Sequence, residues 1–228
     1  MLCFSIVVPV YNESNNIINL IKEIYEQDLQ NYNFETIFVD DRSTDNSLSI
    51  LKSIKKDNFR YIVNKKNLGQ SQSIYNGIKV AKYDTIVTLD GDGQNDPKDI
   101  MILLKYFFKS DQLKLIGGIR KKRKDNYVKI FSSKIANFIR QIILKDDCDD
   151  TGCSLKIFSK KIFLNFPYFN GMHRFLPALF KGYGHQTMFL DVNHRKRNFG
   201  SSKYGTIDRL FKGIIDIIKV SNIIKNKK

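Results

Sequence analysis

Residues 84–100, DTIVTLDGDGQNDPKDI, join three structural signals in one short stretch. The segment 84–90 is rich in β-branched and apolar residues, which is typical of a buried strand. A polar turn with glycines follows, and Pro97 then stands where the first turn of a helix tolerates proline. A strand that passes directly into a helix is the repeating unit of α/β proteins. The stretch therefore predicts an α/β fold and places Asp90, Asp92 and Asp96 at the end of a strand.

The same alternation runs outward through the first half of the chain. Strands are predicted at 4–10, 35–41, 60–67 and 84–90, and helices from about Ser14, at 43–56, 71–82 and 96–108. Such alternation predicts a mostly parallel, doubly wound sheet with helices on both faces. Ligands of these sheets bind beyond the carboxyl ends of the strands. The polar segments VPVYNE, VDDRSTD and LDGDGQ all fall at those ends.

The second half is less regular. Strands are predicted from 114, at 154–160 and at 186–197, and helices at 128–144, 171–184 and 206–225. The helix 128–144 has an apolar face that includes Ile135, Phe138, Ile139 and Ile142. The last helix is strongly amphipathic. There is no internal repeat and no low-complexity linker.

Composition limits the class of protein. The 228 residues include 38 Lys+Arg against 23 Asp+Glu, a formal net charge of +15, which favours anionic partners such as phosphorylated substrates, nucleic acid or an anionic membrane. Three cysteines form no even framework, so we expect reduced thiols in a cytosolic protein. The N-terminus lacks the features of a signal peptide. No uncharged apolar stretch reaches the roughly 18 residues of a membrane span.

The aspartates of the opening stretch admit three interpretations. A calcium loop of the EF-hand type requires Gly at position six and Glu at position twelve, where this chain has Asn95 and Met101, so we exclude it. A plain polar turn would need only Asp96 as the cap of the next helix. A metal–diphosphate site would use Asp90, Asp92 and Gln94 as hard oxygen ligands of a divalent cation.

Several motifs, in order, resemble a known family. IVVPVYNESNNI, FVDDRSTDNS, NLGQSQSIYNGI and TLDGDGQNDP are similar to the nucleotide-sugar-binding half of inverting family 2 glycosyltransferases with the GT-A fold. GGIR, DDTGCSLKIFSK, GMHRFLPAL and RNFGSSKYG narrow the resemblance to the polyprenyl-phosphate type, similar to dolichyl-phosphate mannosyltransferases and their bacterial relatives. Neither a Rossmann nor a P-loop fingerprint is present.

The resemblance implies a role for each matching residue. In the nucleotide pocket it places Pro9, Tyr11, Glu13, Val39 and Asp41, the last two beside the base and ribose. In the metal and diphosphate segment it places Asp90, Gly91, Asp92 and Gln94, with Asp90, Asp92 and Gln94 binding Mg²⁺ or Mn²⁺. Around the phosphates it places Arg120, Arg197 and Lys203, which with Asp92 form the predicted catalytic group. At the acceptor phosphate it places Lys129, Ser133 and Arg174, although Lys129 stands where arginine is more usual.

The activity that the resemblance implies is metal-dependent, inverting sugar transfer. The donor would be a GDP- or UDP-sugar and the acceptor a dolichyl or undecaprenyl type of polyprenyl phosphate, giving a lipid-phosphate sugar for cell-envelope glycan or lipid A modification. A phosphate monoester has a second pKa near ~6, so it attacks without a general base. An alternative, transfer to a saccharide hydroxyl, would require a base such as Asp149 or Asp150. A nucleic-acid-binding module rests on charge alone and lacks a recognised motif, so we expect no nucleic acid partner.

The sequence and the resemblance also predict the domain boundaries and the location of the protein in the cell. Residues 1–205 form the predicted GT-A domain, with a nucleotide-sugar half at about 1–105 and an acceptor half at 106–205. Residues 206–228 form an amphipathic tail that ends in KNKK, and each lysine near an anionic surface contributes ~1 kcal/mol of attraction. We therefore expect a peripheral protein on the cytoplasmic face of the membrane, with a membrane protein as a further candidate partner.

Overall fold

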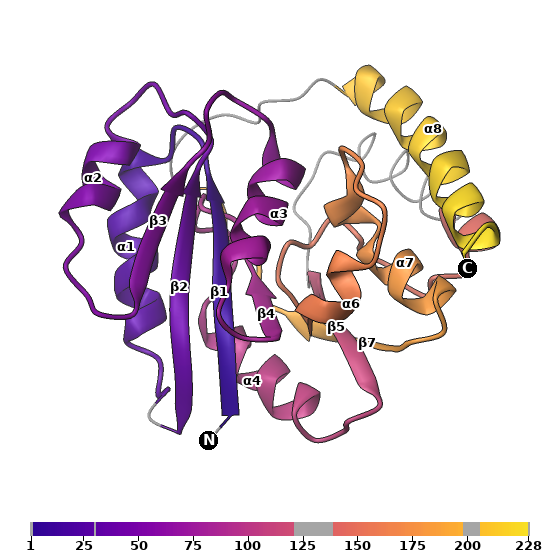
Figure 1. Ribbon diagram of the computed structural model, residues 1–228, viewed down its shortest axis with the longest axis horizontal. Coiled ribbons are helices and arrows are strands. Elements are labelled where there is room, and N and C mark those ends of the chain that lie inside the picture. Colours follow the sequence, from indigo (N-terminus) through magenta and orange to yellow (C-terminus); the bar gives the residue numbers. More distant parts are fainter. Residues whose placement is uncertain (1, 30, 121–138, 198–205, 228) are drawn as a thin grey trace.

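A computed structural model describes residues 2–29, 31–120, 139–197 and 206–227, with side chains in 206–212 left aside. Its centre is a seven-stranded sheet in the order β3-β2-β1-β4-β6-β5-β7 (Figure 1). The strands are β1 Leu2–Val10, β2 Tyr32–Asp40, β3 Phe59–Val63, β4 Thr85–Thr88, β5 Leu113–Arg120, β6 Lys156–Ser159 and β7 Gln186–Val192. The predicted doubly wound, mostly parallel α/β sheet is confirmed, since β6 alone of these strands runs antiparallel to its neighbours.

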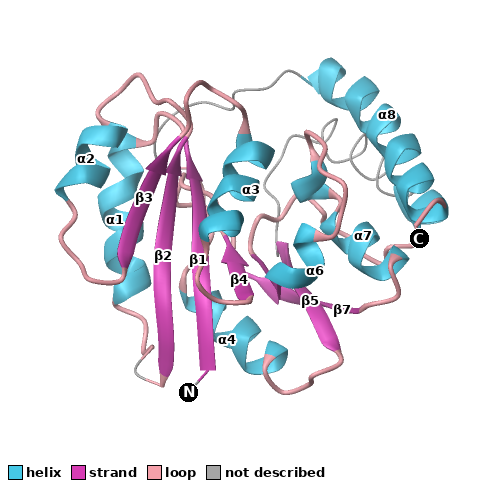
Figure 2. Cartoon of the chain, viewed as in Figure 1, coloured by secondary structure: helices cyan, strands magenta, loops and turns pink. Residues whose placement is uncertain are grey.

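Helices cover both faces of the sheet (Figure 2). They are α1 Ser14–Tyr25, α2 Ser47–Ser53, α3 Gln70–Val80, α4 Lys98–Phe107, α6 Lys160–Leu164, the 3₁₀ turn η1 Met172–Arg174, α7 Leu176–Gly182 and α8 Thr206–Lys225. Residues 139–144 are also helical, and the rest of the helix predicted at 128–144 lies outside the described residues. The short helix α6 was not predicted; Ser159 caps it by accepting from the amide of Ile162.

Two hydrophobic cores result from the alternation of side chains along the strands. In β1, Phe4, Ile6 and Val8 face the core beneath α1, α2 and α4, whereas Val7 faces the core beneath α3, α6 and α7. All four side chains are fully buried. Because side chains alternate across a strand, a nearly continuous apolar run such as FSIVVPV is what a strand covered on both faces requires.

The C-terminal helix α8 belongs to the second core. Ile217 and Val220 are buried there together with residues of α7, and Ile224 packs so closely on Gly182 that a Cβ at Gly182 would lie 2.6 Å from it. Figure 1 shows α8 on the outside of the molecule, beside α7. The opposite side of the helix leaves Ile215 and Ile218 exposed. The predicted amphipathic tail is thus a helix that packs on the domain with one face and presents isoleucines with another.

Candidate active site

The predicted pocket lies where β2, β1 and β4 end side by side. These three parallel strands are neighbours in the sheet, and Pro9 lies opposite Val39 in register. The turn after β4 touches β1 at Gly91, where a Cβ would stand 3.0 Å from the carbonyl oxygen of Pro9. A larger residue at Gly91 would push this turn away from β1, so glycine fixes the distance between two of the loops.

Hydrogen bonds join the loops that follow β1 and β2. The Asn12 side chain accepts from the Thr44 amide at 2.7 Å, and the Asn12 amide donates to the Ser43 hydroxyl at 3.0 Å. Asn12 and Arg42 adopt left-handed backbone conformations, with φ of 55° and 64°. Such conformations strain a residue with a side chain and are frequent at binding sites. The two loops are therefore held together at the position of the predicted pocket.

Two adjacent aspartates end β2 and have different surroundings. Asp41 is buried and accepts from the amides of Leu68 and Gly69, each at 2.8 Å, and from the Asn64 side chain at 2.7 Å. Asp41 thereby positions the start of α3, and its predicted contact with the ribose stays a prediction. Asp40 is fully buried, and its Oδ1 atom has no hydrogen-bond partner among the described residues.

Three other predicted pocket residues have distinct locations. Val39 is fully buried, and a Cβ at Gly77 of α3 would stand 2.9 Å from its methyl group, so the side chain belongs to the core. Any contact of Val39 with a nucleotide would have to come from its backbone. Tyr11 is half-buried in the loop after β1, and Glu13 is buried just before α1.

The turn after β4 brings the predicted metal ligands together. Asp90 accepts from Nε2 of Gln70 at 2.7 Å, and Asp92 accepts from the amide of Gln94 at 3.1 Å. Burial and the nearby charge of Asp92 raise the pKa of Asp90 to about 6. The Gln94 side chain donates to the carbonyl of Arg195 at 3.2 Å, which ties the turn to the segment after β7. Asp96 accepts from the amide of Lys98, the first residue of α4, while Pro97 and not Asp96 occupies the N-cap position.

Arg197 reaches this acidic turn from the far end of the chain. Its guanidinium donates to Oε1 of Glu13 at 2.6 Å and lies 3.9 Å from Oδ2 of Asp92. Three residues predicted to share a site, from segments 184 positions apart, therefore meet. The structure places the Arg197 guanidinium beside Asp92, and a positioned cation of this kind can stabilise developing negative charge.

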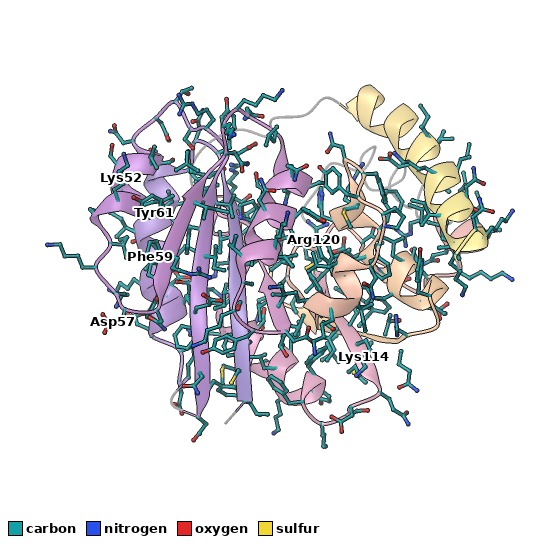
Figure 3. The ribbon with its side chains drawn as sticks, viewed as in Figure 1. Lys52, Asp57, Phe59, Tyr61, Lys114 and Arg120 are labelled. Atoms are coloured by element: carbon teal, nitrogen blue, oxygen red, sulfur yellow. The ribbon has the colours of Figure 1, made fainter. Side chains whose placement is uncertain are left out.

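Arg120 ends β5 and is held by a single carboxylate. Its Nε and Nη2 atoms donate to Asp150 at 2.6 and 2.7 Å, and its amide donates to the same side chain at 3.2 Å. Burial opposes the charge of Arg120, but the hydrogen bonds and charge of Asp150 outweigh it and raise the pKa of the guanidinium. Figure 3 shows Arg120 near the middle of the molecule, away from the sheet edge at Phe59 and Tyr61.

The predicted acceptor residues are only partly described. Arg174 donates to Oδ2 of Asp216 in α8 at 2.8 Å, so its guanidinium joins η1 to the C-terminal helix. Lys129, Ser133 and Lys203 lie outside the described residues. The structure therefore brings Asp90, Asp92, Glu13 and Arg197 together and leaves the assembly of an acceptor site as a prediction.

Sequence reasoning did not predict the contacts of two further groups beside this site, the buried Lys156 and the partly buried His173. Lys156 in β6 is buried and donates to the carbonyls of Thr151 and Cys153, and burial lowers its pKa. His173 bonds through Nδ1 to the Ser71 hydroxyl at 2.6 Å, and burial followed by the charges of Lys156 and Arg174 lowers its pKa to about 3. His173 is thus neutral and links η1 to α3. Local periodicity carries no signal for such contacts, because they join segments distant in sequence.

Comparison with known proteins identifies the family to which this chain belongs. The model of the family described as "Glycosyl transferase family 2" matches residues 5–166, which contain the three loops of the pocket, Arg120 and Asp150. The chain belongs to glycosyl transferase family 2. The resemblance found in the sequence motifs is confirmed.

Named relatives of this family 2 glycosyltransferase act on polyprenyl phosphates. A dodecaprenyl-phosphate galacturonate synthase of Rhizobium johnstonii is 34% identical over 98% of this chain and 68% of its own length. An undecaprenyl-phosphate 4-deoxy-4-formamido-L-arabinose transferase of Shewanella sediminis is 30% identical over 88% of this chain. The match spans 61% of that second protein, so both relatives extend well beyond the region that they share with this chain.

Solved structures agree on the fold. Mannosyl-3-phosphoglycerate synthase from Rubrobacter xylanophilus covers the whole chain with a TM-score of 0.75 at 12% identity, the match spanning 76% of that protein. Glucosyl-3-phosphoglycerate synthase from Mycobacterium tuberculosis, solved with Mn²⁺, UDP-glucose and phosphoglyceric acid, covers 97% of the chain with a TM-score of 0.72 at 15% identity and 80% of its own length. At such identities the likeness establishes the GT-A fold alone.

The acidic turn fits a divalent cation. Asp90 and Asp92 are two oxygen donors; burial, and after it the charge of Asp92, raises the pKa of Asp90, and a cation between the two carboxylates would relieve their repulsion. No cluster of three His, Cys, Asp or Glu side chains occurs among the described residues, so a diphosphate oxygen or Gln94 would have to complete the coordination. Hard oxygen ligands with places left for phosphate oxygens are typical of Mg²⁺ sites.

The raised pKa of Asp90 predicts how the stability of the fold depends on pH. The pKa of Asp90 rises from 3.8 to about 6 on folding, so the carboxylate's contribution to stability is lost as pH rises from about 4 through 6. Asp90→Asn removes this penalty, and at pH 7 with a chelator we expect it to raise the melting temperature by a few degrees. The gain should vanish below about pH 4, where the wild-type carboxyl is protonated in both states. Thermal melts of Asp90→Asn and the wild-type protein across this pH range measure the gain, with the exposed Asp57→Asn as control. A lower melting temperature for Asp90→Asn at pH 7 would show that the charge of Asp90 does not destabilise the fold.

Proposed function

We propose that this glycosyltransferase transfers a sugar from a GDP- or UDP-sugar to a polyprenyl phosphate, with Mg²⁺ or Mn²⁺ bound at the acidic turn. The observation that carries the proposal is the meeting of Asp92 and Glu13 with Arg197 at the carboxyl ends of β1 and β4. The named relatives, which act on dodecaprenyl and undecaprenyl phosphates, supply the acceptor class.

On the donor side, the pocket residues bind and orient a nucleoside diphosphate. Asp90, Asp92 and Gln94 would hold the cation, which when bound supplies Lewis-acid stabilisation of the leaving diphosphate. Arg197 exchanges its contact with Glu13 for the diphosphate and neutralises the charge that develops there. Because the guanidinium is already beside Asp92, little reorganisation is needed at the moment of reaction.

On the acceptor side, a phosphate monoester needs cations and alignment rather than a base. Its second pKa near ~6 leaves it largely dianionic at neutral pH. Asp150 accepts three hydrogen bonds from Arg120, so its carboxylate serves to hold a cation. Arg120 then provides a fixed positive charge for an anionic acceptor.

One assay tests the reaction directly. Purified protein is incubated with a panel of GDP- and UDP-sugars, Mg²⁺ or Mn²⁺, and a polyprenyl phosphate, and the organic phase is analysed for glycolipid. We expect one nucleotide sugar to yield a polyprenyl-phosphate sugar of inverted anomeric configuration. Transfer to a saccharide hydroxyl with none to polyprenyl phosphate would overturn the acceptor assignment.

We further propose that α8 contacts an anionic membrane that holds the lipid acceptor, on its cytoplasmic face. Ile214, Ile215 and Ile218 are exposed on α8. Ile139, Ile142 and Ile143 are exposed on the helical segment 139–144. Both segments adjoin the end of α7, where Lys181 pairs with Asp147 and Gly182 contacts Ile224. Apolar side chains next to exposed lysines at 225 and 227 are typical of interfacial helices. Among the described residues, no helix is long and apolar enough to cross a membrane.

Paired substitutions test this surface. Ile215→Gln with Ile218→Gln removes two side chains that are 64% and 56% exposed, so it should leave the core intact. We expect it to weaken binding to anionic liposomes at low salt about a hundredfold, since each buried apolar side chain contributes roughly 1.5 kcal/mol or more and about 1.4 kcal/mol is a factor of ten. The control, Ile18→Gln with Ile102→Gln, changes equally exposed isoleucines on α1 and α4, across the sheet. Equal loss in both variants, or no binding by the wild-type protein, would contradict the membrane assignment.

A further inference from the structure

The five residues after β7, 193–197, form a strap across the edge of the predicted donor site. Asn193 donates through its amide and side chain to Asp99 of α4 at 2.7 and 3.0 Å. His194 forms an isolated antiparallel bridge with Asn95. The strap is therefore fastened first to α4 and then to the turn that carries Asp90 and Asp92.

Arg195 makes contacts through both its backbone and its side chain. Its amide donates to the carbonyl of Gln94 at 2.9 Å. Its guanidinium donates to Oε2 of Glu23 at 2.6 Å and pairs with Oδ1 of Asp96 at 2.7 Å. One side chain thus connects three elements: the strap, helix α1 through Glu23, and the acidic turn through Asp96.

A cavity separates part of the strap from α1. A cavity of about 260 Å³ borders Asp92, Gly93 and Arg195 together with the face of α1 that carries Asn19 and Glu23. Because this space is not filled by side chains, packing does not set the distance between the strap and α1. The ion pair of Arg195 with Glu23 spans this space, and the pair of Arg197 with Glu13 joins the strap to the residue just before α1.

We infer that Arg195 is a positioning residue that holds the strap to the acidic turn and to α1, and so sets where Arg197 meets the donor diphosphate. The inference rests on the proposed function, because it gives Arg197 a diphosphate to bind. Arg197 follows two residues later in the same extended strap, beside Glu13 and Asp92. A displacement of Arg195 would move Arg197 with it.

Energetics separate this role from a general contribution to stability. The Arg195 side chain is 35% exposed, and ion pairs of that exposure contribute little to folding. A displacement of about 1 Å in a group that contacts the reacting substrate can reduce rates as much as 100-fold. The effect of losing Arg195 should therefore appear in donor binding rather than in the melting temperature.

The test compares Arg195→Gln with Lys196→Gln, which removes the same charge from the adjacent, exposed position of the strap. We expect Arg195→Gln to raise the KM for the nucleotide sugar, and the Kd for the nucleoside diphosphate with Mn²⁺, about tenfold, with a smaller fall in kcat. Lys196→Gln should stay within about twofold. Arg195→Lys should recover part of the loss, since an ammonium group can reach one of the two carboxylates.

A second readout does not depend on the substrate. Hydrogen–deuterium exchange of the peptide containing 193–197 should accelerate in Arg195→Gln and remain unchanged in Lys196→Gln. Equal KM changes in the two variants, or unchanged exchange in Arg195→Gln, would overturn the inference. A wild-type protein that binds no nucleoside diphosphate would instead refute the proposed function, while the exchange experiment would still decide whether Arg195 holds the strap. If Arg195→Gln fails to fold, Glu23→Gln in α1 against Glu26→Gln at the C-cap of that helix gives the same comparison.

Discussion

Asp92→Asn is expected to reduce sugar transfer about a thousandfold while leaving the fold intact. The substitution removes one of the two carboxylates predicted to bind the cation, but retains an oxygen that can accept from the Gln94 amide, as Asp92 does at 3.1 Å. The local turn should therefore survive, and the loss should come from weaker binding of the cation and the diphosphate. Transfer rates in Mg²⁺ and Mn²⁺, together with Mn²⁺ affinity measured by calorimetry, report on both.

The matched control for that variant is Asp57→Asn, the same chemical change at an exposed position before β3 (Figure 3). It should leave transfer and Mn²⁺ affinity unchanged. Transfer by Asp92→Asn at the wild-type rate, or wild-type transfer that persists in excess chelator, would show that the acidic turn does not work through a metal.

Arg197→Gln is expected to slow transfer by about 100- to 1000-fold, whereas Asp149→Asn should change it less than about threefold. The first variant removes the cation beside Asp92, and the second removes a carboxylate that a hydroxyl acceptor would need as a base. Asp149 is the better residue for this comparison because Asp150 holds Arg120, so that its loss would disturb a cation as well. Single-turnover rates with polyprenyl phosphate as acceptor measure the difference.

The opposite order of effects would favour the alternative reaction. A large loss in Asp149→Asn that reverses at high pH, with a small loss in Arg197→Gln, would indicate general-base activation of a hydroxyl. Circular dichroism of both variants serves as the folding control. Asp149 accepts from the Gln141 side chain at 2.8 Å near the surface, and Arg197 is partly exposed, so neither change opens a cavity in the core.

Sequence alone determined the first half of the fold and the chemistry of its loops. The predicted strands at 4–10 and 84–90 and the helix at 71–82 agree with β1, β4 and α3 within a few residues, and the C-terminal helix was predicted at its observed bounds, 206–225. These elements have strong local periodicity, and their burial on one or both faces follows directly from it. The acidic turn was recognisable because three aspartates and two glycines lie within ten consecutive residues, 88–97.

Only the tertiary structure decided which side chains face one another. The pairing of Arg120 with Asp150, 30 residues apart, and of Arg174 with Asp216, 42 residues apart, depends on β6 running antiparallel between β4 and β5 and on α8 packing beside α7. The same packing determined that α8 buries Val220 and exposes Ile215. Local periodicity shows that a helix has an apolar face, but the partner of that face is set by long-range contacts between elements, which no short window of sequence contains.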